Sequence, residues 1–372
     1  MSNATDKLKP LRVWLVHDWL TGMRGGEKVL LELVRMFPES RIATLLHVPG
    51  TTHHEIDRRV AQTSFLQRLP GAAKGYRNFL PLYPAAVRGL KLDGACDLVI
   101  SSSHAVAKNV PVPAGVPHLC YCHTPMRYIW GLQAQYAPRR SARSMALRMV
   151  SGYLRRADVA GSKGVTRFIA NSQTVAARIA RIYAREAAVV HPGIDENFWT
   201  PGQAAAGDFF LVVSALVPYK RLDIAIEAAR ITGHKLAIIG QGPEESRLRT
   251  LAAGMRNIEF LGWRSDDQIR EHYRSCTALV FPGEEDFGLT PVEAQACGRP
   301  VVAFAKGGVT ETVTPETGAF FARQTAEDLA GAMQEARRRE WDPTAIRRQA
   351  MNFTWDRFRQ GIRTEVQQLP GE

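Results

Sequence analysis

Long apolar segments are absent from this chain of 372 residues. No stretch approaches the ~18 consecutive apolar residues needed to cross a bilayer. The polar residues 1–10 also lack the apolar run of a secretory signal. We therefore expect a soluble, cytoplasmic protein whose segment 1–10 is disordered.

Cysteine is also scarce, with five residues in the whole chain. No pair of them has the two-residue gap that is typical of a zinc or redox motif. We predict that they are reduced and packed in the interior, with Cys120 and Cys122 on one face of an apolar strand. The sequence predicts no metal site.

Acidic residues are few in the first half of the chain. Residues 1–200 hold 27 Lys and Arg against 13 Asp and Glu, which is +14, and residues 201–372 hold 21 against 23, which is −2. The two halves add to the net charge of +12. A positive field attracts nucleic acid, anionic lipid or a pyrophosphate-bearing acceptor, and charge alone does not choose among them.

The length and the pattern of apolar residues indicate two α/β domains. A chain of this size exceeds what one hydrophobic core usually supports. Apolar strands alternate with amphipathic helices in both halves, which predicts parallel, doubly wound sheets. Residues 200–208 are rich in Pro, Gly and Ala and read as a linker. We therefore expect one domain at 11–200 and a second at 201–352.

An acidic loop in the second half is the strongest candidate site. The pattern predicts a strand at 278–281, the loop, a helix at about 290–297 and a strand at 301–304. Glu285 lies in the loop and Glu293 in the helix, at the carboxyl end of a strand, where open α/β sheets bind ligands. Two carboxylates so placed can hold two parts of one polyhydroxy ligand.

The first half offers two weaker candidates. Gly25 and Gly26 follow the first strand and precede a helix expected from residue 28, a turn that can cradle an anion or can need glycine for its shape alone. His123 ends a later strand just before Pro125. Its imidazole either faces a ligand at the sheet edge or merely caps the strand.

A basic amphipathic helix is expected at about 138–158. Its arginines include Arg139, Arg140 and Arg143, and apolar residues alternate with them at helical spacing. Such a helix can lie on an anionic membrane, or its arginines can form an ordinary solvated face. The sequence leaves both interpretations open.

Together these motifs resemble family 4 glycosyltransferases of the GT-B fold, in which two Rossmann-like domains face each other across a cleft. The resemblance runs from about residue 11 to 358. Its most specific part is the Glu-x7-Glu element from Glu285 to Glu293, followed by Pro-Tyr-Lys-Arg at 218–221. The sequence segments 17–20 and 123–128 also resemble those of bacterial O-antigen and exopolysaccharide mannosyltransferases.

The resemblance implies roles for the site residues. Lys220 and Arg221 would bind the donor diphosphate together with the glycine turn. Glu293 would bind the ribose, while Glu285 and His123 would bind the sugar. The other implied donor contacts are the backbone of Asp286, Phe287 and Gly288 at the sugar, and the segment Gly262, Trp263 and Arg264 near the base. Asp18, Arg127, Arg139, Arg140 and Arg143 are further candidates for contact with the acceptor or with a membrane.

The resemblance further implies a retaining transferase with no cofactor and no metal. The favoured reaction moves mannose from GDP-mannose to a lipid-linked oligosaccharide at the inner membrane face, in surface polysaccharide biosynthesis. A front-face route, in which the leaving diphosphate deprotonates the acceptor, is favoured over a covalent intermediate on Glu285. Residues 353–372 are expected to form a helix that crosses back to the first domain.

One departure from the family pattern concerns the diphosphate. Ser214-Ala215-Leu216 stands where many relatives have Gly-Arg-Leu, so one cationic contact is missing and Arg221 or Arg127 would contribute more. Three other functions stay open: a transferase that uses a UDP-sugar, a nucleotide-sugar 2-epimerase of the same architecture, and a nucleic-acid-binding protein. The last is the least favoured, because the basic half carries no recognised binding motif.

Overall fold

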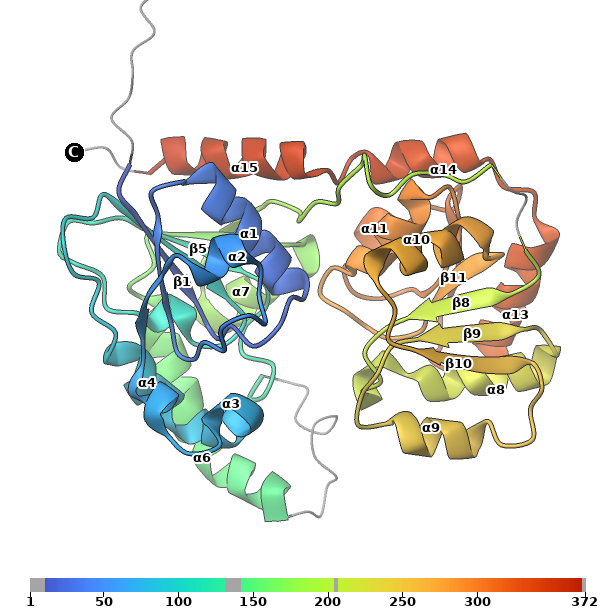
Figure 1. Cartoon of the computed structure of the whole chain (residues 1–372), viewed down its shortest axis with the longest axis horizontal. Coiled ribbons are helices and arrows are strands. Elements are labelled where there is room, and N and C mark those ends of the chain that lie inside the picture. Colours follow the sequence, from blue (N-terminus) through green and yellow to red (C-terminus); the bar gives the residue numbers. More distant parts are fainter. Residues whose placement is uncertain (1–10, 131–141, 204–206, 370–372) are drawn as a thin grey trace, which may run out of the picture. The chain divides into compact units, whose positions relative to one another are not determined.

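The computed structural model describes residues 11–130, 142–203 and 207–369. Their contacts divide the chain into two compact units (Figure 1). The first unit contains the chain up to Asn171, Val175–Val190 and Arg359–Glu372, and the second contains Ser172–Thr174 and His191–Phe358. The expectation of disorder at 1–10 lies outside the described residues.

The first unit is built on a parallel sheet of seven strands in the order β3-β2-β1-β4-β5-β6-β7. Every residue of β1, β4 and β5 is buried, as expected when helices cover both faces of a parallel sheet. The strands are β1 Val13–His17, β2 Arg41–Thr44, β3 Val60–Thr63, β4 Leu98–Ser103, β5 His118–Cys122, β6 Arg167–Ala170 and β7 Ala187–Val189. The helices are α1 Gly25–Met36, α2 His54–Asp57, η1 Phe65–Arg68, α3 Ala72–Gly75, η2 Tyr76–Leu82, α4 Tyr83–Arg88, η3 Ala107–Asn109, α6 Ala142–Ser162 and α7 Gln173–Tyr183.

The second unit has a parallel sheet of six strands in the order β10-β9-β8-β11-β12-β13. Its strands are β8 Phe210–Val213, β9 Leu236–Ile239, β10 Ile258–Gly262, β11 Ala278–Phe281, β12 Val301–Phe304 and β13 Gly318–Phe321. Its helices are η4 Pro218–Lys220, α8 Leu222–Thr232, α9 Glu245–Leu251, α10 Asp266–Ser275, α11 Leu289–Ala296, α12 Val309–Thr312, α13 Ala326–Arg338 and α14 Pro343–Ala350.

Alternation along β8 shows how both faces of the second sheet are covered. Phe210 and Val212 belong to one buried cluster, and Leu211 packs in another that contains Tyr273 of α10. Successive side chains of a strand point to opposite faces, so two separate cores flank the sheet. Helices lie on both sides of it in Figure 1. The predicted doubly wound α/β fold is confirmed in both units.

The division between the units falls at Val190 and His191, ten residues before the boundary expected from composition. The His191 ring stacks on Phe287, and the Ile194 N–H donates to the Phe353 carbonyl at 2.9 Å. These contacts tie the segment after His191 to the second unit. The Pro- and Gly-containing residues 201–203 are exposed and belong to that unit, so the composition of a segment does not show where the two units separate.

The last helix, α15 Trp355–Gln367, starts in the second unit and continues in the first. Arg359 pairs with the buried Glu32 of α1 at 2.6 Å, and Arg167 of β6 pairs with Glu365. These pairs hold the later turns of α15 on the first unit.

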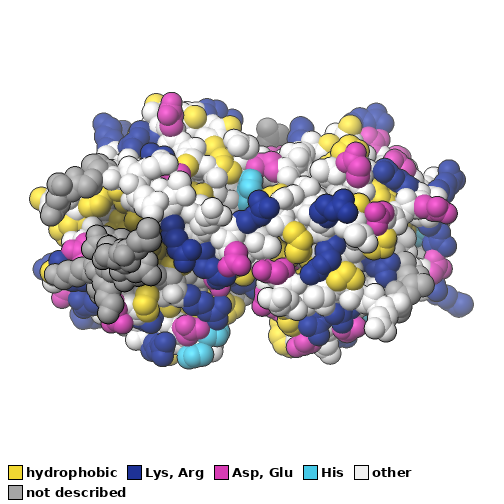
Figure 2. Space-filling view, turned by 90° about the horizontal axis from the view of Figure 1, so that it is seen from above, with side chains coloured by type: hydrophobic (Ala, Val, Ile, Leu, Met, Phe, Trp, Pro, Cys, Tyr) yellow, Lys and Arg dark blue, Asp and Glu magenta, His cyan; other side chains and the backbone are white. Residues whose placement is uncertain are grey.

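The surface carries charges of both signs. Figure 2 shows basic and acidic side chains intermixed on the viewed face. Within the part of the chain that the structure describes, no helix is both long and apolar enough to span a membrane.

Candidate active site

Two neighbouring strands of the second unit carry the strongest candidate residues. The strand order reverses between β8 and β11, which makes this pair the switch point of the sheet, where open α/β sheets bind ligands. Lys220 lies at the end of η4, after β8, and Glu285 lies in the loop after β11. The topology therefore brings together two residues that the sequence separates by a whole helix–strand series.

Lys220 and Glu285 form an ion pair in the second unit. The side chain of each is 15% exposed, so the pair is largely screened from solvent while its edge stays accessible. A cation at this position can neutralise the charge of a leaving phosphate. Its carboxylate partner can accept hydrogen bonds from sugar hydroxyls.

Glycines let three backbone segments meet behind this pair. A Cβ on Gly283 would lie within 3.0 Å of the Tyr219 carbonyl and the Lys220 Cα, and a Cβ on Gly307 would lie as close to the Glu285 carbonyl. Gly308 donates its N–H to the Glu285 carbonyl at 2.9 Å. Gly307-Gly308, which follows the apolar strand β12 after two residues, was not among the residues predicted from the sequence, although this spacing was the available signal.

Arg221 is held differently from Lys220. It adopts a left-handed backbone conformation with φ 53° at the start of α8, a costly geometry for a residue other than glycine. Its guanidinium pairs with Asp223 at 3.0 Å and donates to Gln324 at 3.1 Å. These partners orient the guanidinium at the strand end, and they also occupy part of its donor capacity.

Glu293 lies inside α11 and is buried. Tyr273 of α10 donates its hydroxyl to the Glu293 Oε2 at 3.2 Å. Burial and the neighbouring carboxylate raise the pKa of Tyr273, so this hydroxyl stays protonated. One Glu293 oxygen thus has a fixed donor, which orients the carboxylate in the way expected of a binding residue.

The loop before α11 divides into core and turn residues. Asp286 and Phe287 are buried, and the Phe287 ring stacks on His191 with centroids 5.4 Å apart. Gly288 has φ 88° and precedes the first helical residue. The Phe287 side chain therefore anchors the loop, and only its backbone is suited to the implied sugar contact.

The segment expected near the base ends β10. Gly262 has φ 70°, and the Trp263 side chain is 67% exposed. Arg264 donates to the Trp263 carbonyl at 2.9 Å. An exposed indole beside a strand end offers an aromatic face, although β10 is the edge strand of the sheet, two strands away from β8.

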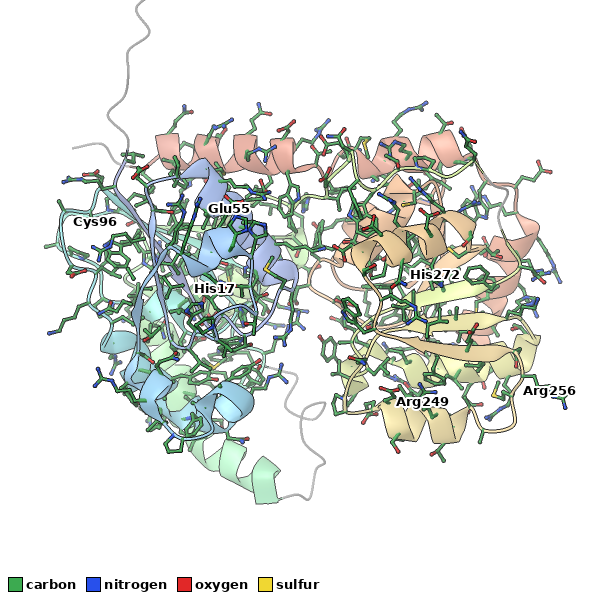
Figure 3. All side chains as sticks on the ribbon, in the orientation of Figure 1. His17, Glu55, Cys96, Arg249, Arg256 and His272 are labelled. Carbon is green, nitrogen blue, oxygen red and sulfur yellow. The ribbon has the colours of Figure 1, made fainter. Side chains whose placement is uncertain are left out.

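The first unit has its own switch point, between β1 and β4. His17 ends β1, Ser102 lies near the end of β4, and His123 follows β5. Ser102 Oγ lies 3.1 Å from His17 Nδ1 and 2.8 Å from His123 Nε2. His17 lies in the interior of the unit (Figure 3). Hence His123 belongs to a hydrogen-bonded chain and is not an isolated strand cap.

Gly25 and Gly26 begin α1, which starts three residues earlier than expected. Glu27 accepts the Arg24 N–H at 3.1 Å, and this capping interaction extends the helix into the glycines. A Cβ on Gly26 would lie 3.7 Å from both His123 Nε2 and His17 Cε1. The helix N-terminus therefore lies against the histidine chain, a position that favours an anion.

Asp18 has a structural role in the first unit. Its buried carboxylate accepts the backbone N–H groups of residues 104 to 107 at 2.7–2.9 Å. Burial raises the pKa of Asp18, but the nearby imidazoles and the N–H donors outweigh burial, so the pKa lies below its ordinary value. Because this carboxylate organises the loop after β4, we do not propose it as an acceptor contact.

The remaining basic candidates are less defined. Arg127 is half-buried four residues after His123. Arg139 and Arg140 lie outside the described residues, and of Arg143 the structure describes the backbone alone, within α6.

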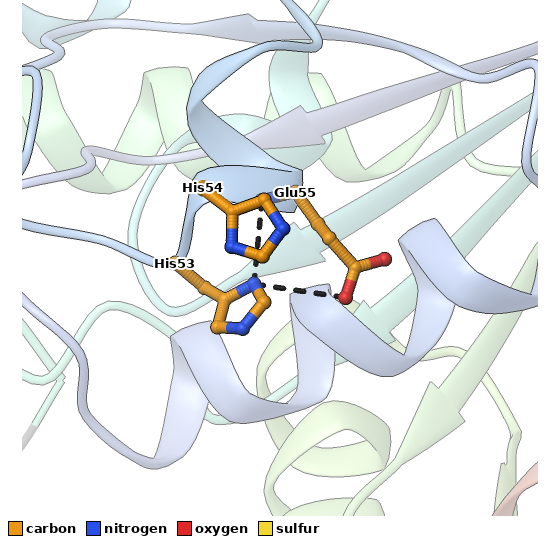
Figure 4. Close-up of side chains that lie close together, drawn as sticks. All are labelled: His53, His54 and Glu55. Carbon is orange, nitrogen blue, oxygen red and sulfur yellow. Dashed lines mark hydrogen bonds and ion pairs between the residues drawn. The ribbon is translucent and has the colours of Figure 1, made fainter.

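One group among the described residues could supply metal ligands. Atoms of His53, His54 and Glu55 lie within 4.8 Å of one another (Figure 4). Arg35, however, donates to the Glu55 Oε1 from two nitrogens at 3.2 Å, and His53 Nδ1 accepts the Glu55 N–H at 3.3 Å. A guanidinium on the carboxylate opposes a cation there, so we assign this group no metal.

The two halves of the chain match two family models. Residues 23–198 match the model described as Glycosyltransferase Family 4, and residues 193–352 match the one described as Glycosyl transferases group 1. Residues 23–198 are thus similar to the first of these glycosyltransferase families, and residues 193–352 are similar to the second. The resemblance to mannosyltransferases in particular is not confirmed by these matches.

Among curated proteins the chain is similar to D-inositol 3-phosphate glycosyltransferases. It is 32% identical over 216 residues to that of Mycobacteroides abscessus, which covers 51% of this chain and 48% of that protein. It is 33% identical over 239 residues to that of Geodermatophilus obscurus, with coverages of 54% and 53%. The chain thus spans about half the length of the curated relatives it matches.

Solved structures share the fold at low sequence identity. HepE of Anabaena in complex with UDP has a TM-score of 0.73 and 18% identity, covering 96% of this chain and 100% of that one. Sucrose-phosphate synthase of Thermosynechococcus elongatus has a TM-score of 0.68 and 17% identity, with coverages of 96% and 99%. The expected GT-B fold is confirmed.

Proposed function

We propose that this protein is a retaining glycosyltransferase that moves a hexose from a nucleotide-sugar to a saccharide acceptor. The observation that carries the proposal is the pairing of Lys220 with Glu285 at the switch point of the second sheet. A transferase of this kind needs a cation for the leaving diphosphate and a hydrogen-bond acceptor for the sugar at one place. Glu293 would bind the ribose, and Lys220 would turn from Glu285 to the phosphates.

The reaction that we favour proceeds on the front face of the sugar. The donor's C1–O bond to the diphosphate breaks, the acceptor oxygen bonds to C1 on the same face, and the leaving phosphate takes the acceptor proton. Glu293 is already engaged by Tyr273, and Glu285 faces a lysine. Neither carboxylate is therefore well suited to act as a general base, which supports the phosphate in that role. Glu285 as nucleophile is the alternative.

The donor we favour is GDP-mannose, because the sequence segments 17–20 and 123–128 resemble those of mannosyltransferases. UDP-glucose is the second candidate, because the structurally similar HepE is described in complex with UDP-glucose. The acceptor we propose is a lipid-linked, phosphate-bearing saccharide of surface polysaccharide biosynthesis. The curated relatives act, by their names, on D-inositol 3-phosphate, which also carries a phosphate.

A thermal-shift panel tests the donor. We expect GDP-mannose, at about a hundredfold excess over its Kd, to stabilise the protein by about 2.7 kcal/mol, with mannose alone giving no shift. The panel compares GDP-mannose, UDP-glucose, GDP and UDP, and Lys220→Met serves as the variant that lacks the phosphate cation. If UDP-glucose alone shifts the unfolding temperature, UDP-glucose takes the place of GDP-mannose as the proposed donor. No shift with any nucleotide would contradict the proposed function.

A transfer assay then separates the remaining alternatives. Each donor that stabilises the protein is incubated with a lipid-linked saccharide, with D-inositol 3-phosphate, or with no acceptor. We expect a glycosylated lipid-linked product whose anomeric configuration matches the donor. Conversion of the donor sugar without an acceptor would identify an epimerase instead.

We also propose that the first unit lies on an anionic membrane while it reaches this acceptor. Between Asp57 and Asp93 the chain has seven Lys or Arg and no Asp or Glu. Phe65 is 44% exposed and Leu82 is 40% exposed in this stretch. Its exposed cations, where the structure describes the side chain, are Arg58, Arg68, Arg77, Arg88 and Lys91. Exposed apolar side chains among cations are typical of a surface that binds acidic lipid.

Replacing both Phe65 and Leu82 by serine should weaken binding to vesicles that contain phosphatidylglycerol by at least about tenfold, because two apolar contacts with the lipid are lost. Vesicle co-sedimentation at constant salt measures this. Ile231→Ser, at a side chain 54% exposed in the second unit, is the matched control and should change nothing. Unchanged binding by the double variant would contradict this surface, and Arg139, Arg140 and Arg143→Ala then tests the helix predicted from the sequence.

A further inference from the structure

Three buried side chains of the first unit lie behind His123 in a single file. Glu27 Oε1 is 3.9 Å from His17 Nε2, His17 Nδ1 is 3.1 Å from Ser102 Oγ, and Ser102 Oγ is 2.8 Å from His123 Nε2. Glu27 is 3% exposed, and His17 and Ser102 are fully buried. His123, at the end of the file, is half-buried.

Glu27, at one end of this file, fixes the direction of the hydrogen bonds along it. Burial raises the pKa of Glu27, but the neighbouring His17 and His104 outweigh it and hold the pKa below its ordinary value. Glu27 is therefore a carboxylate, which accepts hydrogen bonds and donates none. The distance to His17 Nε2 is too long for a hydrogen bond. It is still short enough for the negative charge to favour an N–H over a lone pair on that nitrogen.

The hydrogens of the remaining groups then follow. A neutral imidazole carries one N–H, so a proton on His17 Nε2 leaves Nδ1 as an acceptor. Ser102 must donate its single hydroxyl hydrogen to that Nδ1. Its oxygen is left to accept the Nε2–H of His123, and so His123 Nδ1 carries a lone pair.

We propose that Glu27 and His17 are positioning residues that set the tautomer of His123 through Ser102, so that His123 Nδ1 accepts a hydrogen bond from a substrate hydroxyl. The substrate part of this inference rests on the proposed glycosyltransferase function. The tautomer part concerns the free protein and does not depend on it. A histidine with the opposite tautomer would instead donate its Nδ1–H to the oxygen of the same hydroxyl.

The other groups near His123 are consistent with a neutral ring. The His104 ring lies 6.2 Å from the His123 ring, and the Tyr121 ring lies 5.1 Å from it. Burial lowers the pKa of His123 well below its ordinary value, and the repulsion that a protonated His104 or His17 and the Arg127 guanidinium would exert lowers it further, while Asp18 opposes this to a smaller extent. At pH 8 the ring is thus neutral and a single tautomer can be observed.

Glu27→Gln is a decisive test because the backbone N–H of Arg24 fixes the orientation of the glutamine amide. The Arg24 N–H already donates to the Glu27 Oε2, so the glutamine oxygen would keep that bond and its NH2 group would face His17. His17 Nε2 then becomes an acceptor and Nδ1 a donor. Ser102 turns its hydroxyl toward His123, and the His123 proton moves to Nδ1. Shape and helix capping are both retained.

The measurement is the side-chain nitrogen spectrum of the 15N-histidine-labelled full chain at pH 8, without substrate. The chain has ten histidines, and the signals of His123 are assigned by their loss in His123→Gln. We expect an Nε2–H tautomer in the wild type and an Nδ1–H tautomer in Glu27→Gln. Free imidazole already favours Nε2–H, so the change between the two proteins is the decisive observation.

Two further variants separate positioning from general disruption. Glu32→Gln removes another buried carboxylate from α1, one that pairs with Arg35 and Arg359, and should leave the His123 tautomer unchanged. Ser102→Ala cuts the file, so adding Glu27→Gln to it should no longer shift the tautomer of His123. An Nδ1–H tautomer in the wild type, or no change in Glu27→Gln, would overturn the proposal.

The kinetic consequence provides an independent readout. Once the donor is known, Glu27→Gln should lower kcat by about tenfold, the worth of one hydrogen bond to the substrate, with the donor KM changed by less than about threefold. Glu32→Gln should not lower kcat. A tautomer change without any kinetic effect would retain the positioning of His123 and reject its role toward the substrate hydroxyl.

Discussion

Replacing Glu285 by glutamine is expected to lower the rate of sugar transfer by at least about a hundredfold while leaving the fold intact. Glutamine keeps the shape of the side chain, and its loop stays held by the Gly308 N–H bond to the residue 285 carbonyl. The variant loses the charge that faces Lys220 and the ionised acceptor for a sugar hydroxyl. The measurement is kcat and KM for the donor identified by thermal shift.

The matched control is Glu284→Gln, at the exposed neighbouring position. It removes the same charge from the same loop and should keep nearly full activity. Thermal unfolding of both variants checks that neither loses its structure. Wild-type rates in Glu285→Gln would reject the assignment of this carboxylate to the site, and equal losses in both variants would point to the charge of the loop as a whole.

Asp18→Asn is expected to destabilise the first unit by about 2–5 kcal/mol, because an amide oxygen cannot replace a charged acceptor of four N–H groups. The Asp18 carboxylate is buried and binds all four at 2.7–2.9 Å. The measurement is the unfolding transition of the first unit in denaturant at pH 7. Asp93→Asn is the control, because Asp93 is 73% exposed beside Arg41 at 3.4 Å and its loss should cost little.

The loss of stability in Asp18→Asn depends on pH, because Asp18 is itself a titratable carboxylate. The folded pKa of Asp18 lies below its ordinary value of 3.8. A lowered folded pKa contributes stability above the unfolded pKa and loses it as the pH falls through the folded value. The difference between the wild type and Asp18→Asn should therefore be constant near neutral pH and shrink below about pH 4. A difference that grows on acidification would contradict this account.

Much of the local structure could be predicted from the sequence. The predicted strands at 278–281 and 301–304 match β11 and β12, and the helix predicted at about 290–297 matches α11 to within one residue. Each of these segments has a continuous apolar run or a helical period of apolar residues, bounded by Gly, Ser or charged residues. The residues that the local pattern predicts to be buried are therefore the ones that the fold buries. The segment 48–96 carried no such clear period. It folds into the strand β3 and several short α and 3-10 helices, and those from residue 65 to 88 pack on the core around Tyr83.

The boundary errors have definite causes. Helix α1 starts at Gly25 because the Glu27 side chain caps it, although two glycines are poor helix formers. The second unit starts at His191 because of aromatic contacts with Phe287 and Phe353. In each case a contact made by a side chain outweighed the local preference of the backbone.

The sequence by itself determined that the chain alternates strands and helices in two series. It also determined that Glu285, Lys220 and His123 lie in loops at strand ends and that Glu293 lies within a helix. Only the tertiary structure decided which of these residues meet. It placed Lys220 against Glu285 and connected His123 through Ser102 to His17. Parallel strands are ordered in space by packing of their crossover helices, and not by their order in the chain, so contacts between loops of different strands follow from the switch points. The order of residues in the sequence reveals the hydrophobic period of each helix or strand. The register between strands that are distant in the chain is fixed only when the sheet forms.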